Sequence, residues 1–407
     1  MRKVFLFVAI MAIGFSATAQ TMKVQSAYSD MKNKRLGYAV KNIDEACEHE
    51  DTKADAKTWH YAGLIYTSLL DAAMQEDQKF FKKQKVELTS EQLADKAKAA
   101  FIKSIELEKT AGTNEFMAIN ITTLNNILIT QLDFALAVFN KQQFTEAIPL
   151  FEEIVKSSIA IGKGGSEVAL KSKYCIALAY EYTKQKDKAT EIYRELAKSG
   201  SKEEAVYISL YATNKAAKEM EKAINVLKIG RKNIPSSYKI IALLSGAYQE
   251  IGNKEESNKN IEALINMADT CKDIDMKNSI YVLAGDSKRD AGSIDEALII
   301  YDKALTIKPI QIEANFSKGV MYFNSAIDKI EQAQKIPETD MSGAYDKLIA
   351  ESKETFKIAI PFFENVLSQN PNHYKTLNAL KTIYSRLEMK DKYTEVSAKI
   401  EALRQGK

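Results

Sequence analysis

A short pattern returns through this chain at a spacing of 34 residues, and this spacing constrains the fold more than any other feature. The pattern has a small residue at its second position and usually a large apolar residue four positions later. The spacing is 34 residues from Ala189 to Ala223, from Ala223 to Ser257, and from Ala359 to Tyr393. A period of about 20–50 residues indicates an array of units, each too small to bury its own apolar face without its neighbours.

The units are predicted to be helical. Glycine and proline are scarce, with 16 and 6 residues among 407, and such a composition favours helix. Pro235, Pro309 and Pro371 each lie twelve residues after a small residue of the pattern. We expect each of them just past a helix end, because proline cannot continue a helix. The small residues of the pattern are Ala147, Ala189, Ala223, Ser257, Ala297 and Ala359.

This arrangement resembles the tetratricopeptide repeat (TPR) family, whose units read W-x2-L-G-x2-Y, then A-x3-F, then proline. The first half of the pattern is matched by Trp59, Ala62, Gly63 and Tyr66, with Ala62 in place of leucine. The second half is matched by Ala147/Phe151, Ala189/Tyr193, Ala297/Tyr301 and Ala359/Phe363. The resemblance covers most of residues 24–404. It implies an all-α, right-handed superhelical solenoid of stacked helix-turn-helix repeats.

Two stretches place a proline within the pattern: EAIPLFEEI (146–154) and IAIPFFENV (358–366). We expect Pro149 and Pro361 in the first turn of a second helix, where a missing N–H has no intrahelical partner to lose. The segment Ser293–Glu296 reads as a capping box that starts another second helix. The prolines are therefore interpreted as a repeat signature and not as a binding motif.

The 34-residue spacing fails in places, two of which we interpret as helical insertions. One lies near 71–92 and the other near 330–354, and both are predicted to lengthen the helices of their hairpins. Thr89 and Gln92 are expected to form a capping box after the first insertion.

The predicted domains are N-terminal repeats at 20–161 and C-terminal repeats at 167–407. Between them, the stretch GKGGS at 162–166 is the expected loop or hinge, because its glycines lower local order. It does not fit a phosphate-binding loop, which needs a longer glycine spacing after a strand.

The first residues, MRKVFLFVAIMAIGFSATAQ, are typical of a bacterial signal peptide. A short basic start precedes an apolar core, and an A-x-A site ends at Ala19. We expect residues 1–19 to be removed and the protein to be periplasmic or secreted. No cysteine follows the apolar core, so no lipid anchor is expected. No later stretch of about 18 residues is continuously apolar, so no integral membrane segment is expected after cleavage.

The charge balance does not favour nucleic acid as a partner. Removal of Arg2 and Lys3 leaves 55 basic residues against 54 acidic residues, without the strong basic bias of nucleic-acid-binding proteins. Cys47, Cys175 and Cys271 are predicted to be free, mostly buried thiols, because they lie far apart along a linear array.

Motifs for chemistry are absent from the sequence. Cys47 and His49 are two residues apart, so on a helix they point about 200° apart, and no metal site is expected there. His60 is interpreted as a repeat-surface residue. The sequence contains no H-E-x-x-H, G-x-S-x-G or C-x-x-C motif, so no catalytic residue, cofactor or enzymatic activity is expected.

The resemblance implies that first helices line a groove that binds a peptide or a helix of a partner. The groove positions are expected at Tyr174, Leu178, Glu181, Ile208, Ala212, Lys215, Ala242, Gly246, Gln249, Val282, Asp286 and Arg289. They lack the Lys and Asn pattern with which some family members grip a C-terminal carboxylate. The expected function is a non-enzymatic interaction scaffold for a protein partner in the bacterial cell envelope. The alternative is a glycan-binding or nutrient-uptake-associated envelope protein, although sugar sites favour aromatic platforms and the chain has one tryptophan.

Overall fold

The computed structural model describes residues 21–74, 82–339 and 341–405, which form helices and turns with no strand among them. The chain divides by packing into two compact units, Met1–Val206 and Tyr207–Lys407, and the division falls within α10 (Glu204–Ala216). The first unit contains α2 (Leu36–Glu48), α3 (Ala56–Met74), α5 (Ser90–Ala111), α6 (Met117–Asn140), α7 (Phe144–Ala160), α8 (Glu167–Tyr182) and α9 (Lys186–Lys198). The second contains α11 (Met220–Asn233), α12 (Tyr238–Glu250), α13 (Lys254–Thr270), α14 (Ile274–Asp290), α15 (Ile294–Ile307), α16 (Ile312–Gln334), α17 (Ala344–Gln369), α18 (Tyr374–Arg386) and α19 (Lys390–Gln405).

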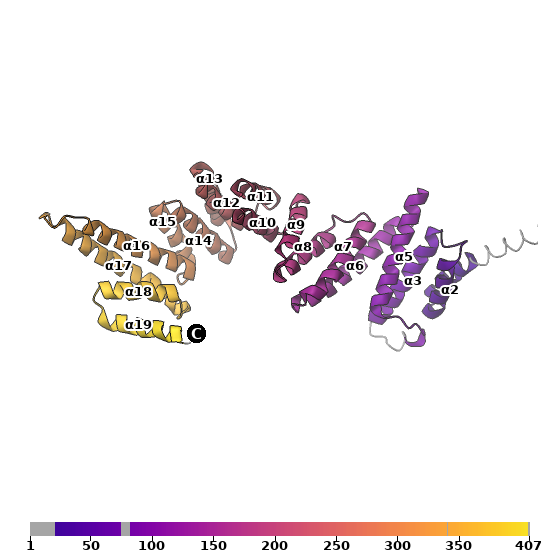
Figure 1. Cartoon of the computed structure of the whole chain (residues 1–407). Helices are drawn as coiled ribbons and strands as arrows, with labels where there is room; N and C mark the ends of the chain where they lie inside the picture. The colour runs from indigo at the N-terminus through magenta and orange to yellow at the C-terminus, as the bar shows by residue number, and fades with distance from the viewer. Residues whose placement is uncertain (1–20, 75–81, 340, 406–407) are drawn as a thin grey trace, which may run out of the picture. The chain divides into compact units, whose positions relative to one another are not determined.

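Helices that follow one another in sequence pack side by side within each unit (Figure 1). In the first unit α3 pairs with α5, α6 with α7, and α8 with α9. In the second unit α12 pairs with α13, α14 with α15, α16 with α17, and α18 with α19, while the first helices α12, α14, α16 and α18 also contact one another in order. The prediction of an all-α array of stacked helical hairpins is confirmed.

The cores of the α3–α5, α14–α15 and α16–α17 hairpins each contain an aromatic ring packed against a glycine. Phe363 of α17 is fully buried, and a Cβ added at Gly319 of α16 would lie 2.7 Å from its ring. The same contact joins Tyr301 to Gly285, at 2.7 Å. In the first unit Phe101 lies against Gly63 in the same way, at 2.4 Å. The small residues of the repeat pattern are buried as well. The periodic pattern therefore records where two helices approach too closely for a larger side chain.

The two pattern prolines are inside helices and not in first turns, so that prediction is wrong. Pro149 lies beyond the first turn of α7, which begins at Phe144. Pro361 lies far inside α17, because the last part of the second insertion, from Ala344 onward, is helical and continues directly into the helix that was predicted to begin near Pro361. Each proline leaves the carbonyl four residues earlier without its usual intrahelical donor.

One capping box is confirmed and the other is wrong. At the start of α5, the Gln92 N–H donates to Thr89 Oγ1 at 3.2 Å, and the Thr89 N–H donates to Gln92 Oε1 at 2.9 Å. At the start of α15, Ser293 makes no side-chain cap. The Glu296 carboxylate instead lies 2.6 Å from Nζ of Lys288, whose side chain is 10% exposed. A buried ammonium needs an anion more than a helix end needs a capping box.

The second predicted insertion lengthens both helices of its hairpin: α16 has 23 residues and α17 has 26, against 13 in α12. Parts of the first insertion and the whole predicted signal peptide lie outside the described residues. The loop at 162–166 lies inside the first unit, between α7 and α8, which pack against each other. The division between the two compact units therefore does not coincide with this loop. That the loop acts as a hinge stays a prediction.

Among the described residues, α6 has the length and apolar composition of a helix that could cross a membrane. In the first unit it packs against α5 and α7 and buries Leu124 and Leu128, while Ile129 and Phe134 remain exposed. The expected lack of an integral membrane segment stays a prediction.

The three cysteines are free thiols, as predicted. Cys175 is buried, whereas Cys47 and Cys271 are half-buried. Burial raises the pKa of the Cys175 thiol to about 11 and that of Cys47 to about 12.

Candidate functional site

The predicted groove residues all lie on first helices of hairpins, and we treat the two units separately. In the first unit, α8 places Tyr174, Leu178 and Glu181 at half-buried positions. Burial raises the pKa of Tyr174 to about 12, and Lys171 Nζ lies 5.1 Å from the centroid of its ring. These three residues therefore present one aromatic ring, one aliphatic side chain and one carboxylate.

In the second unit, half of the predicted groove residues on α10 and α12 are small: Ala212, Ala242 and Gly246. Ala212 and Lys215 are exposed and Ile208 is half-buried on α10, and the Lys215 ammonium pairs with Glu250. On α12, Ala242 and Gln249 are half-buried, and Gly246 is exposed with no atom within 4 Å of an added Cβ. Gly246 therefore differs from the glycines of the core, because no packed ring accounts for it.

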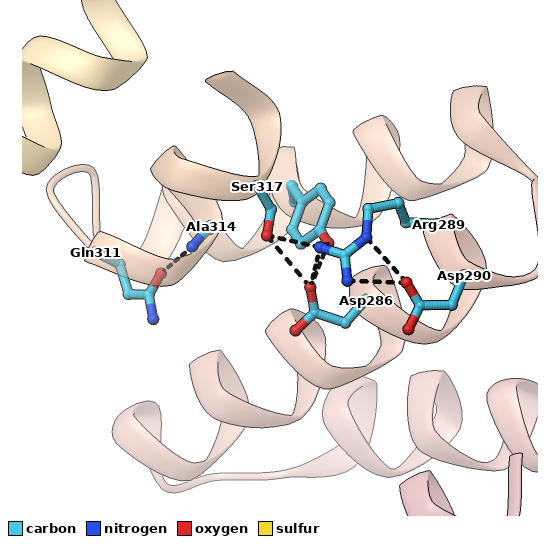
Figure 2. Close-up of polar contacts among 7 residues, drawn as sticks. Asp286, Arg289, Asp290, Gln311, Ala314 and Ser317 are labelled. Atoms are coloured by element: carbon cyan, nitrogen blue, oxygen red, sulfur yellow. Dashed lines mark hydrogen bonds and ion pairs between the residues drawn. The ribbon is translucent and has the colours of Figure 1, made fainter. Parts of the chain in front are cut away.

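The predicted residues on α14 divide into a buried one and a polar pair. Val282 is 6% exposed, so its side chain serves packing between helices. Arg289 Nη1 donates to Asp286 Oδ1 at 2.8 Å and to Ser317 Oγ at 3.0 Å (Figure 2). The buried Tyr301 hydroxyl donates to the same Asp286 oxygen at 2.6 Å.

The other edge of the Arg289 guanidinium is also bound. Nε and Nη2 donate to Asp290 Oδ1 at 3.0 and 2.9 Å (Figure 2). The side chains of Asp286 and Arg289 are each about one-third exposed, at 31% and 32%. The network therefore holds two charged groups in a fixed orientation at the surface, so little side-chain entropy is lost when a partner contacts them.

Sequence reasoning missed a buried polar cluster in the first unit, and its view of His60 as a surface residue is wrong. His60 is 6% exposed, and its Nδ1 donates to Asn120 Oδ1 at 2.6 Å if that nitrogen carries the proton. Asn120 Nδ2 donates to Ser104 Oγ at 3.0 Å. The His60 ring also stacks on Phe116, with 4.4 Å between ring centroids. The sequence signal for this cluster is Ser104 and Asn120, two polar residues at core positions of α5 and α6. They belong to different helices, so the spacing of residues within one helix does not reveal that they meet.

The free energy of unfolding is expected to fall as pH drops below about 6.5. Burial is the main cause that lowers the His60 pKa below 6.5, and it outweighs the carboxylates of Glu108 and Glu115, which favour the charged ring. The unfolded chain takes up a proton below about pH 6.5 while the buried ring stays neutral, so stability is lost in that direction by at most about 1.4 kcal/mol per pH unit.

Urea unfolding followed by fluorescence of Trp59, the one tryptophan, measures this slope in the first unit. In His60→Gln, the free energy of unfolding should no longer change with pH near pH 6. In His49→Gln, this pH dependence should remain. An unchanged slope in His60→Gln would contradict this origin.

No group of His, Cys, Asp and Glu in the described ranges is arranged to hold a metal ion. The expectation that Cys47 and His49 do not form a metal site stays a prediction.

The stacked hairpins, their buried small residues and the ring-on-glycine contacts of some of them make this chain an all-α helical-repeat protein that resembles TPR arrays. No protein-family model matches the chain, and no curated protein matches it. Among solved structures, the chain is similar to nearly identical TPR-like repeats of a putative kinesin light chain from Podosopora anserina, with 19% identity over 44% of this chain and 94% of that chain and a TM-score of 0.35.

Two further similar structures belong to other organisms. One is a tetratricopeptide repeat protein from Parabacteroides merdae, with 12% identity over 62% of this chain and 97% of that chain and a TM-score of 0.38. The other is a human IFIT1 dimer with m7Gppp-AAAA, with 16% identity over 84% of this chain and 74% of that chain and a TM-score of 0.38.

Proposed function

We propose that this chain is a non-enzymatic scaffold of the bacterial cell envelope that binds a segment of a partner protein on the first-helix face of its second unit. The observation that carries the proposal is Gly246. A glycine inside a helix costs about 0.5–1 kcal/mol relative to alanine. At Gly63, Gly285 and Gly319 a packed ring explains this cost, but at Gly246 an added Cβ would meet open space.

An exposed glycine within a helix lets another chain approach the backbone closely. Ala242, one turn earlier on α12, is half-buried and also small. Helix α14 packs beside α12 and supplies the ordered Asp286 and Arg289. Ala242 and Gly246 thus form a shallow strip of small side chains, and Asp286 and Arg289 form its polar edge. Such a strip suits an extended or helical peptide segment.

Gly246→Ala is expected to raise the free energy of unfolding by about 0.5–1 kcal/mol, because alanine is the better helix former and nothing obstructs its methyl group. Urea unfolding followed by circular dichroism measures the change. A loss of stability would show that the surface at Gly246 is not open.

Gly246→Trp tests the function itself, since the bulky side chain covers the strip without entering the core. Crosslinking in the native cells, followed by purification and identification of bound proteins, should recover a partner with the wild-type chain and lose it with Gly246→Trp. Glu221→Trp places the same bulk at an exposed position of the second helix α11 and should retain the partner. Equal recovery with both variants would rule out this face, and retention of a polysaccharide without a protein partner would favour the glycan alternative.

A further inference from the structure

A pocket of about 410 Å³ opens in the second unit between α11, α12 and α13. Leu244 and Tyr248 of α12 line it and are both buried. The cations Lys228, Arg231 and Lys232 of α11 line it as well. The pocket shares helix α12 with the proposed function but no residue, because Leu244 and Tyr248 line it whereas Ala242, Gly246 and Gln249 do not. It does not depend on that proposal.

Arg231 is held in place by a buried amide. Its Nη1 donates to Oδ1 of Asn260 at 2.5 Å, and Asn260 is 1% exposed. Asn260 Nδ2 donates in turn to the Glu256 carbonyl at 2.7 Å, which fixes the amide. Within the described residues, Nε and Nη2 of Arg231 have no hydrogen-bond partner, and no carboxylate lies within ion-pair distance of the guanidinium. An oriented guanidinium with one unused edge can bind two oxygens of a carboxylate together.

The other two cations of the pocket form no direct ion pair, although the Glu256 carboxyl, whose pKa is lowered first by its hydrogen bond with Lys259, also feels the charges of Lys228 and Arg231. Lys228 Nζ lies 5.7 Å from the centroid of the Tyr248 ring, and neither it nor Lys232 pairs with a carboxylate in the described part of the chain. Glu256 is the one acidic lining residue, and its carboxylate accepts a hydrogen bond from Lys259 Nζ at 2.8 Å. The lining side chains therefore carry an excess of positive charge.

We propose that this pocket binds a carboxylate group, with the unused edge of the Arg231 guanidinium as its bidentate partner and Lys228 and Lys232 as the surrounding charges. The apolar surface of Leu244 and Tyr248 accommodates the carbon atoms attached to the carboxylate. Two sources supply such a group: a free polycarboxylic acid, or an acidic segment of a partner protein.

Isothermal titration calorimetry of the full-length protein at low ionic strength tests the proposal with three probes: citrate, N-acetylated hexaglutamate and inorganic phosphate. At least one of the two carboxylate probes should bind saturably and more tightly than phosphate, and added salt should weaken the binding because the site is charged and open. Arg231→Gln should weaken it about tenfold or more, because a bidentate charged contact is lost.

Lys222→Gln is the matched control, since it removes one charge from an exposed position of the same helix, where Lys222 pairs with Glu219. It should leave the affinity unchanged, and thermal unfolding of both variants should show that they are folded. Hexaglutamate binding at least tenfold tighter than citrate assigns the site to an acidic segment, and the reverse order or equal affinity assigns it to a free acid.

Three results would overturn the proposal. The first is that neither carboxylate probe binds. The cations would then only stabilise α11 through their interaction with the negative end of its helix dipole. The second is equal weakening in Arg231→Gln and Lys222→Gln, which would indicate diffuse charge. The third is tighter binding of phosphate than of either carboxylate.

Discussion

Replacing Phe363 by alanine is expected to destabilise the α16–α17 hairpin by about 3–5 kcal/mol. The Phe363 side chain is fully buried, and its ring lies against Gly319 and 6.2 Å from the ring of Phe316, centroid to centroid. The neighbouring backbone cannot fill the space that the ring leaves, so the loss includes a cavity as well as buried apolar area.

Hydrogen exchange of peptides from α16 and α17 measures this loss locally, which suits an array whose units do not unfold as one. Ile358→Ala, on the same helix at a 48% exposed position, should change exchange little. Similar effects of the two substitutions would contradict the central place of the ring in the hairpin.

Gly319→Ala is expected to cost about 1–3 kcal/mol, although alanine is otherwise the better helix former. Its methyl carbon would lie 2.7 Å from the Phe363 ring, so the two helices must move apart or the ring must leave its position.

A double-mutant cycle tests this cause directly. In a Phe363→Ala background the added methyl group fills part of the vacated space, so the two substitutions together should cost less than their sum by about 1 kcal/mol or more. Additive costs would mean that the clash with the ring is not what excludes alanine at Gly319.

The repeat spacing predicted the fold because it reports contacts within one hairpin, between residues of neighbouring helices. Phe363 belongs to the pattern pair Ala359/Phe363, and the residue it packs against, Gly319, lies in the first helix of the same hairpin. Thr89 and Gln92 are three residues apart, so their capping box was predictable as well. Contacts that recur from unit to unit, and contacts between residues one turn apart, leave such a record in the sequence.

The errors arose where contacts between helices override a local signal. Ser293–Glu296 has the form of a capping box, but Glu296 pairs with Lys288 on the preceding helix. His60 looked like a surface residue because its partner, Asn120, is 60 residues away. Pro361 was placed in a first turn because the pattern does not show that the preceding insertion continues as helix.

The candidate sites were predictable only in part for the same reason. The predicted groove positions stay a prediction, and the sequence did not show that Asp286 and Arg289 bind each other or that Val282 is buried. The α11–α13 pocket was missed because its cations read as a solvated face. Asn260, which orients Arg231, is 29 residues away in the next hairpin.

The state of the cysteines has a chemical consequence. A thiol reacts with disulfides and oxidants as its thiolate, and with a pKa of about 11 roughly one Cys175 side chain in ten thousand is ionised at pH 7. The higher pKa of Cys47, about 12, makes that side chain less reactive still. Burial thereby keeps these two side chains as neutral thiols at pH 7, which lowers their nucleophilicity toward disulfides and oxidants.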